Sequence, residues 1–422
     1  MIAMFENNPG LMEKIRDKFA HVETCPQQGD RVFFENAGGA LTLKSVVETS
    51  AKFAAIPDNQ GRDNVASKEL MAVIDKSKAD AKLFLNASSG QVFVGESGTE
   101  LLFRMISNAV LETPKGGQVL GSSLEHPASR SACHRWAKIA DKEYVVVPHN
   151  DQTGTVTADD YKPRVTPDTR VATIIHTSPV TGMGVDVGAI AKTIRSISPD
   201  CFIIVDGIQH AAHGGLDIDC YDIDGYAISP YKVFSRHGYG MAWISDRLSK
   251  LPHDSLIDGP EENWELGTRD TGAYATFSDV VGYFEWLGEY FTDSSDRRDR
   301  LNAAGAAIHG HEKSLCDAML HGVDNLKGLA DMPEVQIIGG VDNPLREGLV
   351  ALNVEGLDAI ELVAALNERG IRVHVRKADH YSGNILNPLG LPSCVRVSMC
   401  HYNSHKEVGR FLEAMRDIVA QK

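Results

Sequence analysis

Short apolar runs alternate with longer amphipathic segments through the first two thirds of the chain. The runs VATII and FIIV are apolar at consecutive positions, which is typical of strands buried on both faces of a sheet. Helical patterns lie between the runs, and this alternation predicts a mostly parallel sheet with helices on both faces. The predicted helices include 99–112, 125–139 and 187–197. The predicted strands are 32–34, 91–95, 117–123, 143–148, 171–178, 202–207, 226–230 and 240–245.

The pattern changes near residue 286. A long helical segment follows, and after it come the short strand-like runs VQIIGG, GLVALNV, IRVHVR and CVRVSM, with helical patterns at 358–368 and 404–419. This order predicts a smaller α+β domain, against which the N-terminal residues are expected to pack. The sequence therefore predicts two domains, a large one over 31–285 and a small one made of 1–30 and 286–422.

Composition and charge exclude several classes of partner. The formal net charge is −15, whereas binding to nucleic acid or to an anionic membrane needs an excess of basic residues. No apolar run approaches the roughly 20 residues that span a bilayer, and the N-terminus lacks the apolar core of a signal peptide. The seven cysteines have no CxxC spacing, so neither a disulfide framework nor a metal site is predicted. We expect a cytoplasmic protein that binds no nucleic acid and no membrane.

Two charged residues end neighbouring apolar runs. The strand FIIVD ends in Asp206, and the run ISPYK ends in Lys232, where open α/β sheets bind their ligands. A carboxylate beside a pyridine nitrogen keeps that nitrogen protonated, and this protonation makes pyridoxal phosphate an electron sink. A lysine near apolar or cationic groups has a lowered pKa and becomes nucleophilic. The pair therefore favours pyridoxal phosphate, although an isolated lysine is more often a solvated side chain.

Two further motifs each allow a functional and a structural interpretation. Ser97, Gly98 and Thr99 precede a helical run, where free N–H groups make an anion site; an ordinary helix cap explains the same residues. No Walker lysine follows, so a P-loop nucleotidase is not supported. His126 follows a predicted strand and opens a helix, where it could stack on a flat ring or serve as a capping residue.

The ordered motifs SGTE, EHPASR, VDGIQ, SPYK, WELGTRDT and VRVSMCHYN resemble those of the class V aminotransferase group of fold-type I pyridoxal-phosphate enzymes. Within that group the chain is most similar to the cysteine desulfurase and selenocysteine lyase branch. The resemblance extends from FFENAGG to the C-terminal helix. It implies a large domain with a mostly parallel seven-stranded sheet, a smaller α+β C-terminal domain, a homodimer and an amino acid as the small-molecule substrate.

The resemblance also implies roles for individual residues. Lys232 would form the Schiff base with the cofactor and move the α-proton, and Asp206 would pair with the pyridinium nitrogen. Gln209 would hydrogen-bond the ring hydroxyl oxygen, while His126 would stack on the ring. Arg396 would bind the substrate α-carboxylate, a task that suits its bidentate fork. The remaining implied residues are Gly98, Thr99, Ser229 and Tyr231 at the phosphate, Gly267 and Thr268 at the phosphate of the neighbouring subunit, and the backbone at Asn36 and Ala37 beside the substrate.

Three departures from the desulfurase pattern bear on the reaction. The stretch RVHVRKADHYSGNILNPLGLP lacks the cysteine that accepts sulfur as a persulfide in that branch, and Cys394 and Cys400 are expected to be structural. Tyr231 stands where histidine is usual. Pro179 replaces an asparagine often found near the ring hydroxyl. Sulfur transfer through an enzyme persulfide is therefore not expected.

The leading hypothesis is a pyridoxal-phosphate lyase that eliminates a β- or γ-substituent or cleaves a C–S bond without a persulfide. His126, His380 or Tyr381 could protonate the leaving group. An aminotransferase or epimerase is the alternative, and a cofactor-binding protein without catalysis is a third. The substrate side chain depends on loops 57–66 and 376–390, where Arg62, Arg376 and His380 indicate a polar or acidic group.

Overall fold

The computed structural model describes residues 5, 8–57 and 59–421. Residues 1–4 and 6–7 of the expected small domain, residue 58 of the loop 57–66, and residue 422 therefore lie outside the described residues. None of the helices in the described part of the chain combines the length and the apolar character needed to cross a membrane.

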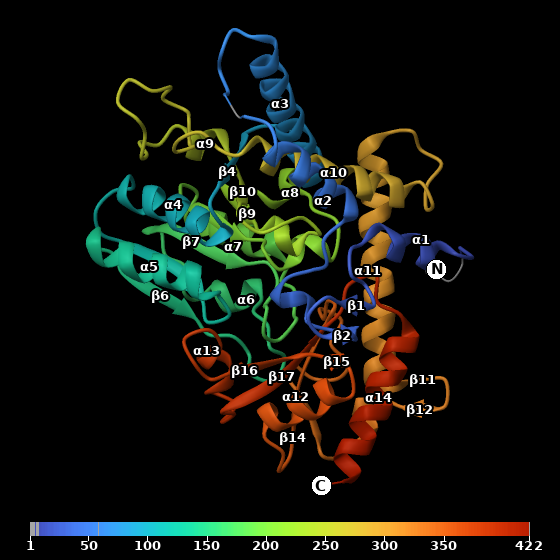
Figure 1. Ribbon diagram of the computed structural model, residues 1–422. Coiled ribbons are helices and arrows are strands. Elements are labelled where there is room, and N and C mark those ends of the chain that lie inside the picture. The colour runs from blue at the N-terminus through green and yellow to red at the C-terminus, as the bar shows by residue number, and fades with distance from the viewer. Residues whose placement is uncertain (1–4, 6–7, 58, 422) are drawn as a thin grey trace.

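A seven-stranded sheet forms the centre of the larger part of the molecule (Figure 1). Its order is β4-β10-β9-β8-β7-β5-β6. The pairs from β9 to β6 are parallel, and β10 alone runs antiparallel to its neighbours β9 and β4. The predicted mostly parallel sheet is thus confirmed. The strands are β4 Gln91–Gly95, β5 Gln118–Ser122, β6 Glu143–Val147, β7 Thr169–Ile175, β8 Phe202–Asp206, β9 Gly225–Ile228 and β10 Gly240–Ile244.

Both faces of this sheet are covered. In β8, Phe202 and Ile204 belong to the hydrophobic core shared with α4 (Gly98–Leu111) and α5 (Pro127–Ile139). The alternate residues Ile203 and Val205 belong to a second core on the opposite face, because successive side chains of a strand point to opposite sides. This arrangement explains the continuous apolarity of the run. The second core includes α3 (Val65–Leu85), α7 (Val187–Ile197) and α10 (Thr271–Gly288).

Helix α7 illustrates how the local sequence specifies these elements. The side chain of Asp186 accepts a hydrogen bond from the N–H of Ala189 at 2.9 Å and caps the first turn. Val187, Ile190, Ala191 and Ile194 are buried, and their spacing places them on one stripe that packs on the sheet. The predicted helix 187–197 is confirmed at its bounds.

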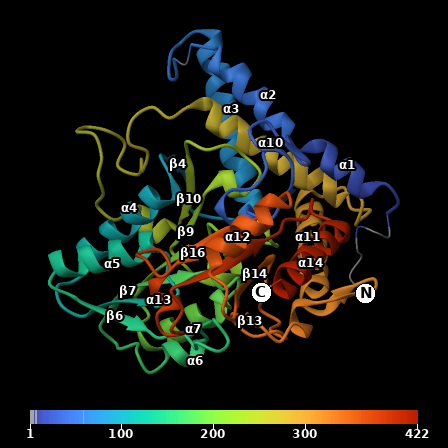
Figure 2. The same ribbon diagram turned by 60° about the horizontal axis from the view of Figure 1, so that its bottom comes forward.

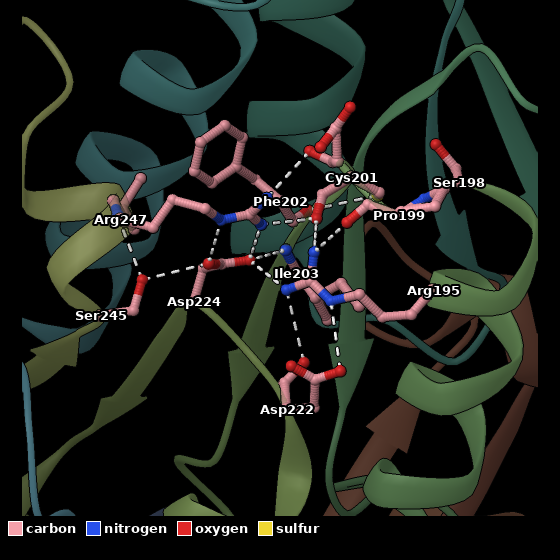
Figure 3. Close-up of polar contacts among 12 residues, drawn as sticks. Arg195, Ser198, Pro199, Cys201, Phe202, Ile203, Asp222, Asp224, Ser245 and Arg247 are labelled. Atoms are coloured by element: carbon pink, nitrogen blue, oxygen red, sulfur yellow. Dashed lines mark hydrogen bonds and ion pairs between the residues drawn. The ribbon is translucent and has the colours of Figure 1, made fainter.

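An ionic cluster joins the strands at the sheet edge where β8 and β9 begin (Figure 3). Asp224 accepts hydrogen bonds from Arg195 Nη2 at 2.8 Å, from Arg247 Nη2 at 2.6 Å and from the N–H of Ile203 at 2.9 Å. Its other oxygen accepts from Ser245 Oγ at 3.0 Å. The buried carboxylate is therefore paired and fully hydrogen-bonded, as a buried charge must be to be tolerated. The cluster lies at the edge where β8 and β9 begin, so the opposite, carboxyl-end edge of the sheet remains available for a ligand site.

A four-stranded antiparallel sheet forms the C-terminal part, in the order β13-β14-β17-β16. It has its own hydrophobic core, to which α11, α12 and α14 contribute. Figure 2 shows α11 and α14 side by side near this sheet. The elements are β13 Val335–Ile337, β14 Leu349–Val354, β16 His374–Lys377, β17 Ser393–Ser398, α11 Arg297–His321, α12 Ala359–Glu368 and α14 His405–Ala420.

Two of the predicted strands are arranged in ways that the sequence pattern did not indicate. The run at 32–34 is not in the large sheet, because β3 (Val32–Phe33) pairs in parallel with β15 (Ile371–Arg372). The run IRVHVR consequently divides into β15 and β16, which have different partners. The shorter elements are α1 Leu11–Lys18, β1 Thr24–Cys25, β2 Gly29–Asp30, η2 Asn36–Gly38, α2 Lys44–Ala54, α6 Ala158–Tyr161, η3 His210–Ala212, α8 Ile218–Tyr221, η4 Pro230–Lys232, α9 Asp246–Ser249, β11 Gly322–Val323, β12 Leu326–Lys327, η5 Leu329–Asp331 and α13 Gly383–Leu386.

The N-terminal segment contacts both parts of the molecule. Arg16 in α1 donates to the carbonyl of Tyr402 at 2.7 Å, while the ring of Phe19 lies 5.4 Å from that of Phe234 and 4.6 Å from that of Tyr402. The expected division between residues 285 and 286 falls in the last turn of α10. The domain bounds therefore stay a prediction.

Candidate active site

The loops that leave the carboxyl ends of β4, β5, β7, β8 and β9 surround one pocket. This edge of an open α/β sheet is where ligands bind. We call it the central pocket. It brings together seven of the residues predicted from the sequence. Its lining is Thr99, His126, Ile175, Thr177, Pro179, Asp206, Ile208, Gln209, Ser229, Tyr231 and Lys232.

Gly98 starts helix α4 at a point where no side chain fits. A Cβ on Gly98 would lie 2.5 Å from Ser229 Oγ and 2.5 Å from Ile208 Cδ1. Thr99, the next residue, lines the central pocket. The first turn of α4 therefore presents its free N–H groups beside two hydroxyl groups, which is a suitable cradle for a phosphate. Ser97 also acts as the ordinary cap of this helix, accepting from the N–H of Glu100 at 3.1 Å.

Asp206 ends β8 and is buried. Its Oδ1 accepts a hydrogen bond from the N–H of Ile208 at 3.1 Å. Burial raises the pKa of Asp206 to about 6, although this hydrogen bond and the charge of Lys232 both oppose the rise. Asp206 is thus a desolvated carboxylate near neutral pH, and a protonated ring nitrogen is the kind of partner that would stabilise it.

Glu125 is a second buried carboxyl group near Asp206. Its Oε1 accepts from the N–H of Ile175 at 2.8 Å and from Ser122 Oγ at 3.1 Å. Burial, and then the charge of Asp206, raise the pKa of Glu125 to about 8. At pH 7 Glu125 is therefore mostly neutral and adds little negative charge beside Asp206.

Lys232 lies in the single turn η4 that follows β9. Its Nζ donates to Gln209 Oε1 at 3.1 Å. Burial, and then the positive charge of Arg396, lower the pKa of Lys232 to about 7, while Asp206 opposes the change. Half of the amine is therefore neutral at pH 7, which makes it a competent nucleophile and proton carrier.

A buried chain of hydrogen bonds extends from Lys232 to helix α11. Beyond the Lys232 contact, Gln209 Nε2 lies 3.2 Å from His213 Nε2, and His213 Nδ1 lies 2.7 Å from Glu312 Oε2. The charge of Glu312 raises the pKa of His213 against the opposing effect of burial, which is the largest single cause. While the imidazole of His213 is neutral, its Nε2 can accept from Gln209 Nε2, and the Gln209 oxygen then faces Lys232.

His126 combines the two interpretations that the sequence left open. Its Nδ1 accepts from the N–H of Ala128 at 3.2 Å and caps α5, and its ring also lines the central pocket. Burial, and then the charge of Lys232, lower the pKa of His126 to about 4. The imidazole is therefore neutral at pH 7 with its proton on Nε2, which suits a stacking surface better than an acid.

Arg396, in the C-terminal sheet, and the turn at Asn36 both adjoin the pocket. Arg396 is buried in β17, and its Nη1 donates to the carbonyl of Pro179 at 3.0 Å. Burial, and then the charge of Arg376, lower the pKa of Arg396 to about 9. A Cβ on Gly38 would lie 3.5 Å from Arg396 Nη2, so the backbone after Asn36 borders this guanidinium.

The side chain of Asn36 fixes that turn. Its Nδ2 donates to the carbonyl of Ser398 at 2.8 Å and to Asn403 Oδ1 at 3.2 Å, and its Oδ1 accepts from the hydroxyl of Tyr402. The N–H of Ala37 donates to Ser398 Oγ at 2.9 Å. Asn36 and Ala37 therefore hold the backbone of this turn in place. Their hydrogen-bonding groups are already occupied by other residues of the protein.

Several predicted residues lie away from the central pocket. Gly267 and Thr268 are exposed in the loop between α9 and α10, which projects from the body of the molecule in Figure 1. His380 is exposed and lines a neighbouring cleft. The ring of Tyr381 lies 6.1 Å from that of His126, although its side chain is largely exposed. Arg62 is exposed as well.

The cysteines lie outside the pocket lining. Within the described residues all seven are free, and five of them are buried. Burial raises the pKa of Cys394 to about 12, so this thiol is not a nucleophile at neutral pH.

Sequence reasoning missed some of the lining. Thr177 and Ile208 follow strands β7 and β8, so the rule that placed Asp206 would also have found them. Glu312 lies inside a long helix, 99 positions from His213, and no local signal marks it.

Comparisons with known proteins agree on one family. The model of the family Aminotransferase class-V matches residues 32–266 and 302–411. The cysteine desulfurase-like protein ustD of Aspergillus flavus is 26% identical over 93% of this chain and 88% of its own length. The aminotransferase-like protein FGM3 of Gibberella zeae is 25% identical over 97% and 98%. The solved structure of a cysteine desulfurase from Thermococcus onnurineus has the same fold, with a TM-score of 0.81 and 20% identity over 97% of this chain and 98% of that chain.

Proposed function

The chain belongs to the class-V aminotransferase family of pyridoxal-phosphate enzymes, and on that premise we propose that it cleaves a carbon–sulfur bond of an amino acid without an enzyme persulfide. The observation that carries the proposal is that Lys232 and Asp206 line the same pocket, and that none of the described residues lining it is a cysteine. The amine is half neutral at pH 7, and the buried carboxylate of Asp206 would stabilise a cationic ring nitrogen. Pyridoxal phosphate supplies both the aldehyde and the ring nitrogen that these groups require.

The donor set of the pocket fits this cofactor. The N-terminus of α4 at Gly98, with Thr99 and Ser229, would hold the phosphate, since a side chain at Gly98 would fill that cradle. Tyr231 also lines the pocket. Its ring stacks on that of His237, with 4.1 Å between the ring centroids. Gly267 and Thr268 are exposed, and they would reach the phosphate of a neighbouring subunit rather than this pocket. The homodimer and the cytoplasmic location stay predictions.

The cofactor, when bound, withdraws electrons from the substrate α-carbon. Asp206 would keep the proton on the ring nitrogen, and the neutral ring of His126 would support one face of the cofactor. Gln209, held by His213 and Glu312, would meet the ring hydroxyl oxygen. Lys232 Nζ would hold the cofactor covalently and then carry the α-proton.

Arg396 would bind and orient the substrate α-carboxylate. Its Nη1 bond to the carbonyl of Pro179 fixes the guanidinium plane, and the backbone after Asn36 closes one side. Pro179 thus contributes through its carbonyl oxygen, although it lacks the amide side chain found at this position in relatives. The burial of Arg396 makes a bidentate pair with a carboxylate strong, because water is excluded.

The absence of a pocket cysteine supports cleavage without sulfur transfer to the enzyme. The segment 376–390 contains no cysteine, and Cys394 and Cys400, which flank Arg396 in the sequence, are buried. Burial raises the pKa of both thiols above the ordinary value. The sulfur product would therefore leave the site directly.

The test is to mix the purified holoenzyme with one equivalent of each candidate amino acid, without a keto acid, and to follow the absorbance of the cofactor together with the products. Cysteine and its S-conjugates are included. Release of a sulfur product with return of the starting spectrum would support the lyase. Lasting conversion of the cofactor to its amine form with a keto acid would instead establish an aminotransferase, and an inverted α-carbon an epimerase. The Lys232→Ala variant should have no turnover; substantial activity in it would refute the assignment.

A further inference from the structure

The direction of each hydrogen bond behind Lys232 determines where His213 carries its proton. An ammonium group only donates, so the Gln209 atom that Lys232 Nζ meets at 3.1 Å is the amide oxygen. The amide nitrogen of Gln209, which also only donates, therefore faces His213 Nε2 at 3.2 Å, and this ring nitrogen must accept. The imidazole is then neutral with its proton on Nδ1, where Glu312 Oε2 accepts it at 2.7 Å.

A cofactor ring requires the opposite orientation of the Gln209 amide. In the proposed function Gln209 meets the ring hydroxyl oxygen. That oxygen accepts from Gln209, because it shares its own proton with the nitrogen through which Lys232 would hold the cofactor. The amide nitrogen must then face the ring, and the amide oxygen must face His213 Nε2. Two acceptors that face each other in a buried site are costly, so the contact is restored only when Nε2 carries a proton.

The pair of His213 and Glu312 is suited to take up this proton. Both side chains are buried, and Glu312 Oε1 forms no hydrogen bond with any described residue. A buried carboxylate held by one neutral ring gains a counter-charge when that ring is protonated. The pKa of His213 is raised; burial, the largest effect, opposes the rise, and the charge of Glu312 is the largest effect that favours it.

The other titratable groups around His213 leave this proton to the pair. Burial raises the pKa of Cys400 and lowers that of His401, so the first stays a thiol and the second a neutral ring. Glu347 stays ionised, because the charge of its own histidine partner lowers its pKa although burial opposes this. Lys232, with a pKa of about 7, has lost most of its charge by pH 8.

We propose that His213 is a positioning residue for the cofactor: its Nε2 accepts from Gln209 in the free protein and carries a proton in the cofactor-bound protein, so that Gln209 presents its amide nitrogen to the ring hydroxyl oxygen. Glu312 supplies the counter-charge, and the proton comes from solvent. The inference rests on the proposed function for the cofactor, and not on the bond that the enzyme cleaves. By linkage, cofactor binding must raise the pH at which Nε2 loses its proton.

The test follows the Nε2 proton of His213 by NMR. The histidines are labelled with ¹⁵N in deuterated protein, and their ring nitrogen signals are recorded from pH 6 to pH 10 with and without pyridoxal phosphate. The signals of His213 are assigned by their loss in His213→Gln. His210 is the matched control, because it pairs with Glu347 at the same 2.7 Å but contacts Thr177 instead of Gln209.

The pH at which half of Nε2 has lost its proton should rise by about 1 to 2 units on cofactor binding, the scale of a charge-assisted hydrogen bond. The negative phosphate also favours a protonated ring through space, and Gln209→Leu separates this effect from the hydrogen bond. In Gln209→Leu the shift should fall to less than about half of the wild-type value. His210 should shift less than His213. No shift in the wild type, or an equal shift in Gln209→Leu, would overturn the proposal.

Cofactor affinity gives a second measurement that needs no turnover. In His213→Gln an amide N–H can replace the Nε2 proton at every pH, whereas His213→Leu offers no donor. At pH 7 the dissociation constant of pyridoxal phosphate should rise about 10-fold or more in His213→Leu, the effect of one lost buried hydrogen bond, and less than about threefold in His213→Gln. Equal losses in the two variants would show a purely structural role and overturn the proposal.

The two proposals of this article fail in different ways. A protein that binds no pyridoxal phosphate would overturn the proposed function and the role of His213 together. Binding of the cofactor without the shift at His213 would overturn only the role of His213. The expected shift in a protein that cleaves no carbon–sulfur bond would support the role of His213 and refute only the proposed reaction.

Discussion

The lowered pKa of Lys232 can be measured on the cofactor-free protein. An ordinary lysine has a pKa of 10.5, and that of Lys232 is about 7. The difference corresponds to about 5 kcal/mol between the two protonation states. At pH 7 about half of the Lys232 amines are neutral, against about 1 in 3,000 for an ordinary lysine. Only the neutral amine reacts with an electrophile, so the labelling rate reports this fraction.

The assay is trace acetylation from pH 5 to pH 10, followed by peptide mass spectrometry, with the exposed Lys377 as internal reference. Labelling of Lys232 should reach half of its maximum near pH 7, whereas that of an ordinary lysine still rises at pH 9. In Arg396→Met the midpoint should move to higher pH, because Arg396 is the largest charge effect on Lys232. A midpoint above pH 9 in the wild type would refute the reasoning.

The lowered pKa of Lys232 should also make the free energy of unfolding depend on pH. The unfolded chain retains a proton on this lysine between about pH 7 and pH 10.5, and the folded chain releases it. The free energy of unfolding of the cofactor-free wild type should therefore rise with pH across this window relative to that of Lys232→Met. Urea unfolding of the two proteins at pH 7 and pH 10 measures the difference. A difference that stays constant would contradict the lowered pKa.

Three further substitutions test other parts of the site. Asp206→Asn removes the charge that, in the proposed function, would hold the ring proton. It should lower kcat at least about 100-fold, the scale of a lost preorganised charge contact; steady-state kinetics measures this. Glu312→Gln replaces the ion pair with His213 by a neutral hydrogen bond, so urea unfolding should show a loss of about 1–3 kcal/mol at pH 6. Glu312 raises the pKa of His213 because it stabilises the protonated imidazole. The stability lost in Glu312→Gln should therefore be smaller at pH 9, as the imidazole loses its proton. Asn36→Ala leaves the buried partners of this amide unpaired and should cost about 1–3 kcal/mol in urea unfolding, without changing cofactor absorbance.

The sequence predicted the elements whose signals are local. The ends of β8 and β9 were found because an apolar run stops at a charged or polar residue, and Asp206 and Lys232 follow directly from that pattern. Spacing on one stripe likewise predicted α7. The resemblance to a family then gave roles to residues such as His126 and Gln209, which chemistry alone left open between function and capping.

Features that depend on distant partners were not predictable in this way. The run at 32–34 has the same apolar pattern as a strand of the large sheet, and only its pairing with Ile371 and Arg372 shows where it belongs. The contact of His213 with Glu312 joins a loop to the inside of a helix. The pairing of His374 with Arg396 in the C-terminal sheet likewise depends on the register of β16 and β17. A single sequence does not specify which of several possible registers forms.

The pairing of β3 with β15 has a consequence for biosynthesis. All residues that line the central pocket lie between Thr99 and Lys232, so they leave the ribosome well before the C-terminal sheet is made. Val32 and Phe33, by contrast, find their strand partners only when residues 371 and 372 have been synthesised, and the turn at Asn36 waits for Ser398. Contacts of such long sequence separation form late. A nascent chain would thus complete its cofactor-facing surface first, and the segment at Val32 and Phe33 would stay without its strand partner until residue 372 has been made.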